Sequence, residues 1–300
     1  MEEYINNTTC ENKYLSLMNK VLNEGIEKND RTGVGTLSLF GQMVEYNVNE
    51  DDGVYTIPMF TTKCVFFKGV ITELLWFLSG NTNTNVLKDQ GNNIWDGNTS
   101  RKTLDKLGLP YDEGELGPGY GYQWIHSGGT WKPDGQSEGG VNQIKFIINE
   151  LRNNPESRRA VLNAWSPSDL SNMALPPCHV MYVFNKTGDN RLSCHLTLRS
   201  NDMFLGHPFN VLSTSILLIL ICKCVNMTPD KVSFSMVDCH IYKNHVEQTQ
   251  IQLERPTLRL PTLTINKEIK EYEDMLNLKY EDFKLHNYKK WPAIKAEMAV

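Results

Sequence analysis

The fold is decided by residues 192–225, which read LSCHLTLRSNDMFLGHPFNVLSTSILLILICKCV. The stretch begins with alternating apolar and polar residues over 192–198, a pattern typical of a β-strand. It ends in an apolar run over 211–225, which we interpret as a buried core helix. The longest uninterrupted apolar part of that run, 216–222, is far shorter than the roughly 20 residues needed to cross a bilayer. The stretch therefore predicts a strand followed by a core helix.

Further strands and helices are predicted on both sides of this stretch. Residues 36–48, 160–165 and 180–184 are rich in β-branched or aromatic residues and predict strands. Helical spacing marks residues 14–22, which end before Gly25, and also residues 71–78 and 141–151. A strand-rich middle with helices around it predicts an α+β fold. We expect a single domain, residues 1–300, around a large mixed β-sheet flanked by helices.

Residues 80–140 are rich in Gly, Asn, Asp and Pro, as in GELGPGYGYQW and SGGTWKPDGQSEGG. Long loops of this kind in a compact enzyme are often the segments that handle substrates. The loop-rich segment is therefore a candidate part of a binding site.

The composition excludes some classes of protein. A net charge of -5 argues against a nonspecific nucleic-acid binder, so any bound phosphate must be held by a local cluster of cations. Seven cysteines at irregular spacing, and a start (MEEYINNTTC) without a charged and then apolar leader, indicate a reducing compartment. We expect a cytoplasmic protein that does not bind membranes.

Cys178 follows two prolines in the motif ALPPCH, at the start of a predicted strand. The prolines restrict the backbone just before the thiol, which helps to aim a side chain. A cysteine at such a position is usually part of the core, whereas a reactive thiol needs cationic neighbours that favour its thiolate form. Four arginines in short polar motifs could supply that charge, although each taken singly could be a solvated surface residue: Arg31, Arg158, Arg159 and Arg199.

A polar segment, residues 199–210, lies directly before the apolar run. If the run is a buried helix, we expect Asn210 at its amino end and Arg199, Ser200 and Asp202 in the preceding turn. A core helix does not require such a polar segment, so residues 199–210 are a candidate binding motif.

The motif DCHIY, residues 238–242, is a third candidate. Its His240 and Tyr242 alternate and could point to the same side of a strand. Its Cys, His and Asp, or the pair Cys222 and Cys224, could suggest zinc. Neither group has a partner pair at the spacing of a zinc finger, so we expect no metal site.

These motifs belong to a set of blocks that resemble the thymidylate synthase family over nearly the whole chain, from DRTG at 30–33 to KAEMAV at 295–300. The blocks follow the order that they have in that family, which makes the resemblance specific. The others are 61–63, 73–77, 94–96, 116–121, 157–159, 174–179, 199–200, 205–210 and 240–242.

The resemblance implies a methyltransferase that converts dUMP to dTMP by reductive methylation. Its co-substrate would be 5,10-methylenetetrahydrofolate, which gives the one-carbon unit and the hydride and leaves as dihydrofolate. Cys178 would attack C6 of the uracil ring and form a covalent adduct. Glu73 would relay protons at the O4 edge through ordered water, and Tyr120 would act near the C5 proton. Asp202 and Asn210 complete the implied catalytic set.

The resemblance also implies a homodimer in which each site takes residues from both subunits. Arg31, Arg199 and Ser200 would hold the phosphate of dUMP, and Arg158 and Arg159 would reach it from the partner subunit.

The amide of Asn210 would bind both O4 and N3–H of uracil, since it offers a donor and an acceptor, whereas cytosine presents the opposite pattern. His240 and Tyr242 would bond the sugar hydroxyl. The implied dUMP contacts also include His179, Asn201, Asp202 and Ile241.

For the folate, the resemblance implies that Asp202 bonds the pterin and that the C-terminal residues 298–300 close over the site and exclude water. The implied folate contacts are Lys63, Ile94, Trp95, Leu175, Asp202, Leu205, Gly206, Phe209, Tyr242, Met298 and Ala299.

The chain departs from the family pattern at five positions. Cys64 stands where arginine is frequent, which affects a contact to the folate tail or the C-terminus, and Phe66 replaces a histidine of some members. Leu198, His207 and Val237 also depart from the pattern, and we expect all three to lie near the nucleotide or folate pocket.

Two other functions are compatible with part of this pattern. A dUMP 5-hydroxymethylase would add water in place of hydride, but Trp95 and the complete C-terminal tail favour methylation. A noncatalytic nucleotide-binding or structural protein with the same fold would have no need of Cys178, Glu73, Tyr120 and Asn210 together. A helix-surface position for Glu73 is disfavoured by its apolar neighbours, residues 74–77.

Overall fold

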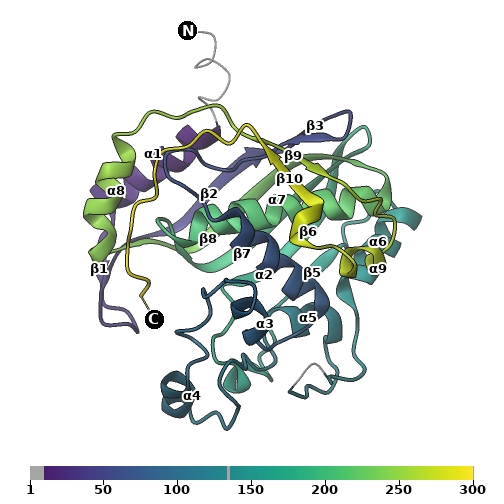
Figure 1. The fold of residues 1–300 in the computed structure, drawn as a ribbon, viewed down its shortest axis with the longest axis horizontal. Helices are drawn as coiled ribbons and strands as arrows, with labels where there is room; N and C mark the ends of the chain where they lie inside the picture. The colour runs from purple at the N-terminus through teal and green to yellow at the C-terminus, as the bar shows by residue number, and fades with distance from the viewer. Residues whose placement is uncertain (1–9, 134–135, 300) are drawn as a thin grey trace.

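A six-stranded β-sheet forms the centre of the structure, a computed structural model that describes residues 10–133 and 136–299 (Figure 1). The strand order is β1-β2-β8-β7-β6-β5. Neighbouring strands are antiparallel except β7 and β8, which are parallel, so the predicted mixed sheet is confirmed. The strands are β1 (Ile26–Lys28), β2 (Thr36–Asn47), β5 (Val161–Asn163), β6 (His179–Gly188), β7 (Arg191–Asp202) and β8 (Thr228–Tyr242).

The core helix α7 (Gly206–Val225) connects the two parallel strands. Parallel neighbours need such a crossover because a tight hairpin cannot join them. Its 20 residues are long and apolar enough to cross a membrane, so the argument from the short apolar run 216–222 does not hold for the whole helix, which begins at Gly206 rather than at the predicted residue 211. Most of α7 is nevertheless buried against the rest of the described chain, as a core helix should be.

The other predicted helices are also present. They are α1 (Cys10–Glu24), α2 (Phe67–Ser79) and α6 (Gln143–Asn153). Helix α2 ends where Gly80 takes a left-handed conformation (φ 74°), which glycine adopts at little cost. Helix α6 begins after Asn142, whose side chain accepts a hydrogen bond from the backbone of Lys145.

The structure contains elements that the sequence patterns did not indicate. A second sheet has the order β10-β9-β4-β3, formed by β3 (Asn49–Asp51), β4 (Val54–Thr56), β9 (Thr262–Ile265) and β10 (Phe283–His286). Strands of three or four residues are too short to show alternation. Two further helices are α8 (Val246–Leu253) and α9 (Tyr272–Leu276).

The described residues of the loop-rich segment, 80–133 and 136–140, gather at the lower end of the molecule in Figure 1. The segment includes three short helices, α3 (Asn85–Lys88), α4 (Arg101–Leu107) and α5 (Gly121–His126). The hydroxyl of Ser100 caps α4 by accepting from the backbone of Thr103. Turns between these helices carry Ile94, Trp95, Asn98 and Tyr120, which line a cavity.

The two faces of the main sheet have different surroundings. Phe234 and Met236 of β8 are buried on the face that packs against α7. Val237 and Met43 lie on the opposite face, where they are 42% and 70% exposed. Because adjacent residues of a strand point to opposite faces, this exposed apolar surface follows from the same strands that build the core.

Candidate active site

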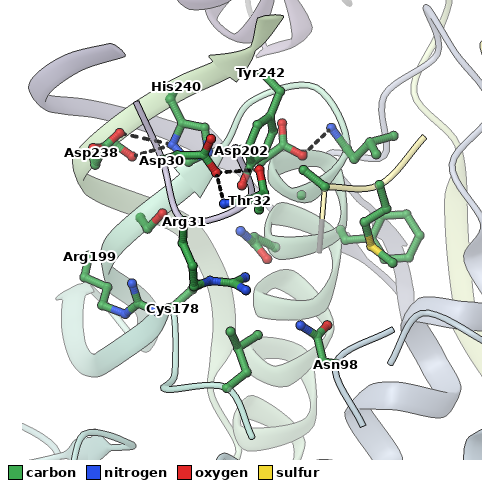
Figure 2. A pocket seen from close by; sticks show the side chains of 18 of the residues that line it. Asp30, Arg31, Thr32, Asn98, Cys178, Arg199, Asp202, Asp238, His240 and Tyr242 are labelled. Atoms are coloured by element: carbon green, nitrogen blue, oxygen red, sulfur yellow. Dashed lines mark hydrogen bonds and ion pairs between the residues drawn. The ribbon is translucent and has the colours of Figure 1, made fainter. Parts of the chain in front are cut away.

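A cavity of about 540 Å³ lies at the carboxyl ends of β7 and β8, beside the start of α7 (Figure 2). Pockets that bind small ligands have volumes of about 300–1,000 Å³. The lining comes from distant segments of the chain, including the turn before β2 and the C-terminal tail. The predicted site residues that line it are Arg31, Glu73, Ile94, Trp95, Tyr120, Leu175, Cys178, His179, Arg199, Ser200, Asp202, Leu205, Gly206, Phe209, Asn210, His240, Tyr242, Met298 and Ala299.

Cys178 lies directly before β6, at the cavity wall. The guanidinium group of Arg199 donates to the carbonyl oxygens of Pro177 (2.9 Å) and Pro176 (2.7 Å). The backbone N–H of Cys178 donates to the hydroxyl of Tyr120 at 2.9 Å. Three hydrogen bonds therefore hold the turn that carries the thiol.

Opposing effects set the charge of Cys178. Burial is the larger effect and raises the pKa of the thiol above its ordinary value. The charges of Arg199 and Arg31 and a hydrogen bond with Tyr120 lower that pKa without outweighing burial. Arg199 therefore favours the thiolate, as the sequence predicted, but because burial raises the pKa more, Cys178 is a protonated thiol at neutral pH. Loss of its proton must accompany any attack.

Glu73 faces the cavity from α2. The indole N–H of Trp95 donates to its carboxyl group at 2.8 Å. Burial raises the pKa of Glu73 to about 7, and the bond from Trp95 offsets only part of that rise. A carboxyl group with this pKa can give or take a proton near neutral pH, as a proton relay requires.

Tyr120 has an unusual backbone conformation (φ 36°, ψ -100°) for a residue other than glycine. Its ring stacks on Phe77, with centroids 4.8 Å apart, and meets Trp95 edge-on at 5.4 Å. Burial raises the pKa of Tyr120 well above its ordinary value, so the phenol stays neutral. The ring contacts hold that phenol beside Cys178.

The parallel register of β7 and β8 pairs Asp202 with His240. His240 and Tyr242 both line the cavity, as their alternation predicts, and their rings meet at 5.0 Å. Burial works to lower the pKa of His240, but the hydrogen bond to Asp238 (3.1 Å) and the charge of Asp202 outweigh it and raise that pKa. Within the described chain, Nε2 of His240 is buried without a hydrogen-bond partner. A buried nitrogen of this kind is suited to a ligand.

Asn210 presents its amide to the cavity. Its Oδ1 lies 2.8 Å from Nε2 of His179, and its Nδ2 donates to Oδ1 of Asn201 at 3.0 Å. Burial lowers the pKa of His179 to about 4, so this imidazole is neutral. Each half of the Asn210 amide keeps one unused bonding position for a ligand.

The prediction that Arg199, Ser200 and Asp202 lie in a turn before the core helix is wrong. Arg199, Ser200 and Asp202 belong to β7, which continues to Asp202, and Asn210 is the fifth residue of α7 rather than its first. The carboxylate of Asp202 accepts from two backbone N–H groups of the short connection into α7. The strand extends into polar residues because their side chains face a cavity instead of the core.

Some predicted contacts lie outside the cavity. Ile241 is fully buried on the opposite side of β8 from its neighbours, so its side chain is a core residue. Asn201 points into the core from β7 for the same reason. The ammonium group of Lys63 is buried, donates to the carbonyl oxygen of Phe204 and lies 3.8 Å from the centroid of that ring. These three side chains therefore do not line the cavity.

Arg158 and Arg159 are exposed on the segment between α6 and β5, away from the cavity of their own chain. Their predicted role in a partner's site stays a prediction. Met298 and Ala299 line the cavity, whereas Val300, the last residue of the expected closing tail, lies outside the described residues.

Several lining residues had no role predicted from the sequence, among them Asp30, Thr32, Asn98 and Asp238. Asp30 accepts from the backbone N–H groups of Thr32 (2.8 Å) and Gly35 (2.7 Å), which shapes the turn that carries Arg31. Side chains of Asp at such turns are a recognisable signal. Asn98 lies in an irregular loop and gave no signal.

Three of the unusual positions, Leu198, His207 and Val237, directly adjoin lining residues in the sequence, as expected, but their own side chains do not line the cavity. Leu198 and His207 are fully buried in the core, and Val237 is on the exposed sheet face. Cys64 and Phe66 also lie outside the lining. None of these departures changes the cavity wall directly.

The cavity combines three chemical environments. Arg31 and Arg199, close to Cys178 in Figure 2, form a cationic end suited to an anion. Next to it lie the thiol and the amide of Asn210, and Trp95 belongs to an aromatic and apolar wall. In the described parts of the chain, no three His, Cys, Asp or Glu side chains are grouped so that they could hold a metal ion.

Comparison with known proteins identifies the family. A sequence model described as thymidylate synthase matches residues 12–300. The chain belongs to the thymidylate synthase family. Its membership confirms the predicted class of enzyme, a methyltransferase that converts dUMP to dTMP by reductive methylation, and gives no support to 5-hydroxymethylation.

The names of similar proteins agree with this family assignment. The chain is 43% identical to the thymidylate synthase of Equine herpesvirus 2, with 98% of this chain and 99% of the relative covered. It is 42% identical to that of Saccharomyces cerevisiae, with 97% of each covered. It is 44% identical to the bifunctional dihydrofolate reductase-thymidylate synthase of Paramecium tetraurelia, and spans 63% of that longer protein.

Proposed function

We propose that dUMP is methylated in this cavity through a covalent bond between Sγ of Cys178 and C6 of the uracil ring. The observation that carries this proposal is that one cavity wall holds Cys178 next to two guanidinium groups and the amide of Asn210. The phosphate would bind Arg31 and Arg199, and the amide would bind O4 and N3–H. This placement brings the pyrimidine ring to the thiol.

Attack by Cys178 breaks the C5–C6 double bond and leaves an enolate whose C5 is a nucleophile. Arg199 favours the anionic sulfur that forms as the thiol proton passes to water in the cavity, and Glu73 in its protonated form stabilises the enolate at O4 through water. The phenol of Tyr120 lies where it can assist proton removal at C5. Elimination of Cys178 restores the ring at the end of the reaction.

The remaining part of the cavity fits a reduced folate. A flat pterin ring suits the aromatic wall at Trp95, and the carboxylate of Asp202 offers an acceptor beside it. When bound, 5,10-methylenetetrahydrofolate supplies the one-carbon unit and the hydride. Met298 and Ala299 would shield this part of the site from water.

The experiment that tests the function is incubation of the protein with dUMP and 5,10-methylenetetrahydrofolate. Stoichiometric formation of dTMP and dihydrofolate, the latter followed by its absorbance, is the expected result. A modified nucleotide without dihydrofolate would contradict methylation and indicate the addition of water. No consumption of dUMP would reject the assignment of this cavity.

The enzyme is proposed to act as a homodimer. The exposed Met43 and Val237 mark an apolar sheet face, and Arg158 and Arg159 are exposed outside their own cavity. Sedimentation equilibrium should give twice the chain mass of 34.3 kDa. A mixture of inactive Arg158→Glu and Cys178→Ala variants should regain activity through mixed dimers. A monomeric mass, or no regain, would reject shared sites.

The seven cysteines all lie within the described residues and are free thiols. Free thiols persist in a reducing compartment, which supports the proposed cytoplasmic location. Fractionation of the producing cells tests this location directly, and recovery from an oxidising compartment would contradict it.

A Glu73→Gln variant is expected to lose about 10²-fold in kcat, since the amide cannot deliver a proton. In the wild type, kcat should fall as the pH rises through about 7, where Glu73 ionises, and the variant should lack this decline. Steady-state kinetics across neutral pH measure both effects. Glu113→Gln, a change at an exposed carboxyl group, is the control and should keep the wild-type profile.

The same substitution, Glu73→Gln, should lower kcat but raise the stability of the folded protein at high pH. The folded protein holds the Glu73 proton more tightly than the unfolded chain, so wild-type stability falls as the pH rises from 4.5 towards about 7. Above that range Glu73→Gln should be the more stable protein in urea denaturation. Equal pH dependence of the two proteins would contradict a raised pKa.

A further inference from the structure

A chain of hydrogen bonds begins at the cavity wall and passes through Asn210 towards the core. The hydroxyl of Tyr182 lies 2.8 Å from Nδ1 of His179, whose Nε2 lies 2.8 Å from Oδ1 of Asn210. On its other side, Nδ2 of Asn210 donates to Oδ1 of Asn201 at 3.0 Å. The amide at the cavity is therefore bonded at both ends by buried side chains.

The chain continues behind Asn201 to residues with no contact with the cavity. Nδ2 of Asn201 lies 3.3 Å from Nδ1 of His207, and 3.1 Å and 3.2 Å from the sulfur atoms of Met203 and Met236. Nε2 of His207 lies 2.8 Å from the hydroxyl of Tyr46. All five side chains are almost completely buried.

The surroundings of Asn201 decide which way its amide faces. A thioether sulfur can accept a hydrogen bond but cannot donate one. The reversed amide would place a carbonyl oxygen against Met203, Met236 and the ring nitrogen of His207. Burial lowers the pKa of His207 to about 3, so its ring is neutral and carries one proton. Nδ1 must then accept from Asn201 while Nε2–H donates to Tyr46.

This orientation is passed on to Asn210. Because Oδ1 of Asn201 can only accept, Asn210 must turn its N–H group towards it and its oxygen towards the N–H of His179. Neutral His179 in turn accepts from Tyr182. All five hydrogen bonds therefore run in one direction, from Tyr182 to Tyr46.

We propose that His207 is a positioning residue that, through Asn201, sets the orientation of the Asn210 amide and thereby selects uracil over cytosine. Uracil offers an acceptor at O4 and a donor at N3, whereas cytosine offers a donor at N4 and an acceptor at N3. An amide held in the observed orientation fits uracil, and the reversed amide fits cytosine. The inference rests on the proposed function, in which Asn210 reads the pyrimidine.

The test compares the dissociation constants of dUMP and dCMP by calorimetric titration. His207→Leu removes the acceptor for Asn201 and should lower the preference for dUMP about tenfold, since the amide can then reverse. His207→Gln supplies an acceptor and a donor and should restore most of the preference. Loss of preference without rescue by glutamine would overturn the proposal, as would an unchanged preference in His207→Leu.

A second variant covers the case in which His207→Leu does not fold. Tyr46→Phe removes only a hydroxyl group and leaves Nε2–H of His207 without an acceptor, which favours the tautomer that opposes Asn201. It should lower the preference for dUMP about threefold. Leu218→Ala changes a buried residue of α7 that takes no part in the chain of hydrogen bonds. It is the control for destabilisation and should leave the preference for dUMP over dCMP unchanged. An equal loss in the control would reject a specific role of His207.

Nitrogen NMR of labelled histidines gives a readout that is independent of nucleotide binding. His207 and His179 should both be neutral with the proton on Nε2 in the wild type, and Tyr46→Phe should change the tautomer of His207. Protons on Nδ1 in the wild type would overturn the inference. If wild-type protein failed to bind dUMP while these tautomers were present, the proposed function would be rejected and the hydrogen-bond chain would stand.

Discussion

A Cys178→Ala variant is expected to lose on the order of 10⁴-fold or more in kcat, because without the thiol C5 of the pyrimidine cannot become a nucleophile. The binding of dUMP should change little, since the phosphate and ring contacts come from other residues, such as Arg199 and Asn210. Dihydrofolate absorbance measures the rate, and calorimetry measures the binding.

A control variant and a trapping experiment make this test specific for Cys178. Cys10→Ala removes another partly buried thiol, at the start of α1, and should retain wild-type activity. Mass spectrometry of wild-type protein trapped with a 5-fluorinated dUMP and 5,10-methylenetetrahydrofolate should place the added mass on the peptide that contains Cys178, because the fluorine cannot leave C5 as a proton does once C5 has bonded to the one-carbon unit. Turnover by Cys178→Ala within tenfold of the wild type would rule out the covalent route.

A Glu11→Ala variant is expected to lose about 3–5 kcal/mol in the free energy of unfolding. The carboxylate of Glu11 is fully buried and accepts hydrogen bonds of 2.7–2.9 Å from the backbone N–H and hydroxyl groups of Thr61 and Thr62. Its removal leaves buried donors without an acceptor. Urea denaturation monitored by circular dichroism measures the loss.

Two matched variants show whether the loss comes from the buried hydrogen bonds of the Glu11 carboxylate or from any change of an acid on α1. Glu11→Gln keeps one acceptor oxygen and should lose roughly half as much, whereas Glu24→Ala changes an exposed acid on the same helix and should stay within about 0.5 kcal/mol of the wild type. If Glu11→Ala lost no more than Glu24→Ala, the buried hydrogen bonds would not be the cause.

The Glu11 contacts also bear on the active site. The backbone oxygen of Thr61 accepts from the N–H of Trp291, and the indole of Trp291 donates to the oxygen of Pro256. The carbonyl oxygen of Glu297 is bonded to His245 at 2.7 Å. These contacts guide the C-terminal tail from the buried Thr61 turn to the cavity, which it reaches close to the turn between β1 and β2 (Figure 1). Loss of Glu11 should therefore also weaken folate binding.

Much of the fold could be predicted because its signals are local. The periodicity of residues 14–22, 71–78 and 141–151 marks helices, and the change of pattern within 192–225 marks the strand and core helix that organise the sheet. The four-stranded sheet could not be predicted, because its strands are too short to carry a periodic pattern and because the pairing of β4 with β9 joins segments far apart along the chain.

The candidate site shows the same division. Residue types by themselves left Cys178 with the ordinary interpretation of a core cysteine, and the blocks shared with a family identified it as a nucleophile. The motifs also named Glu73, Asn210 and Arg199, and the structure brings all of these into one cavity. Sequence motifs could predict these site residues because the functional group of each residue is known from its type alone.

The direction of a side chain was decided by the tertiary structure. Ile241 lies between two cavity residues of β8 yet faces the core, and Asn201 lies between Ser200 and Asp202 with the same result. The sequence by itself determined the family, the main elements and the chemical groups of the site. Only the packing of β7 against β8 and α7 decided that the buried His207 stands behind Asn210, because that contact depends on register and burial between segments, and no local pattern records them.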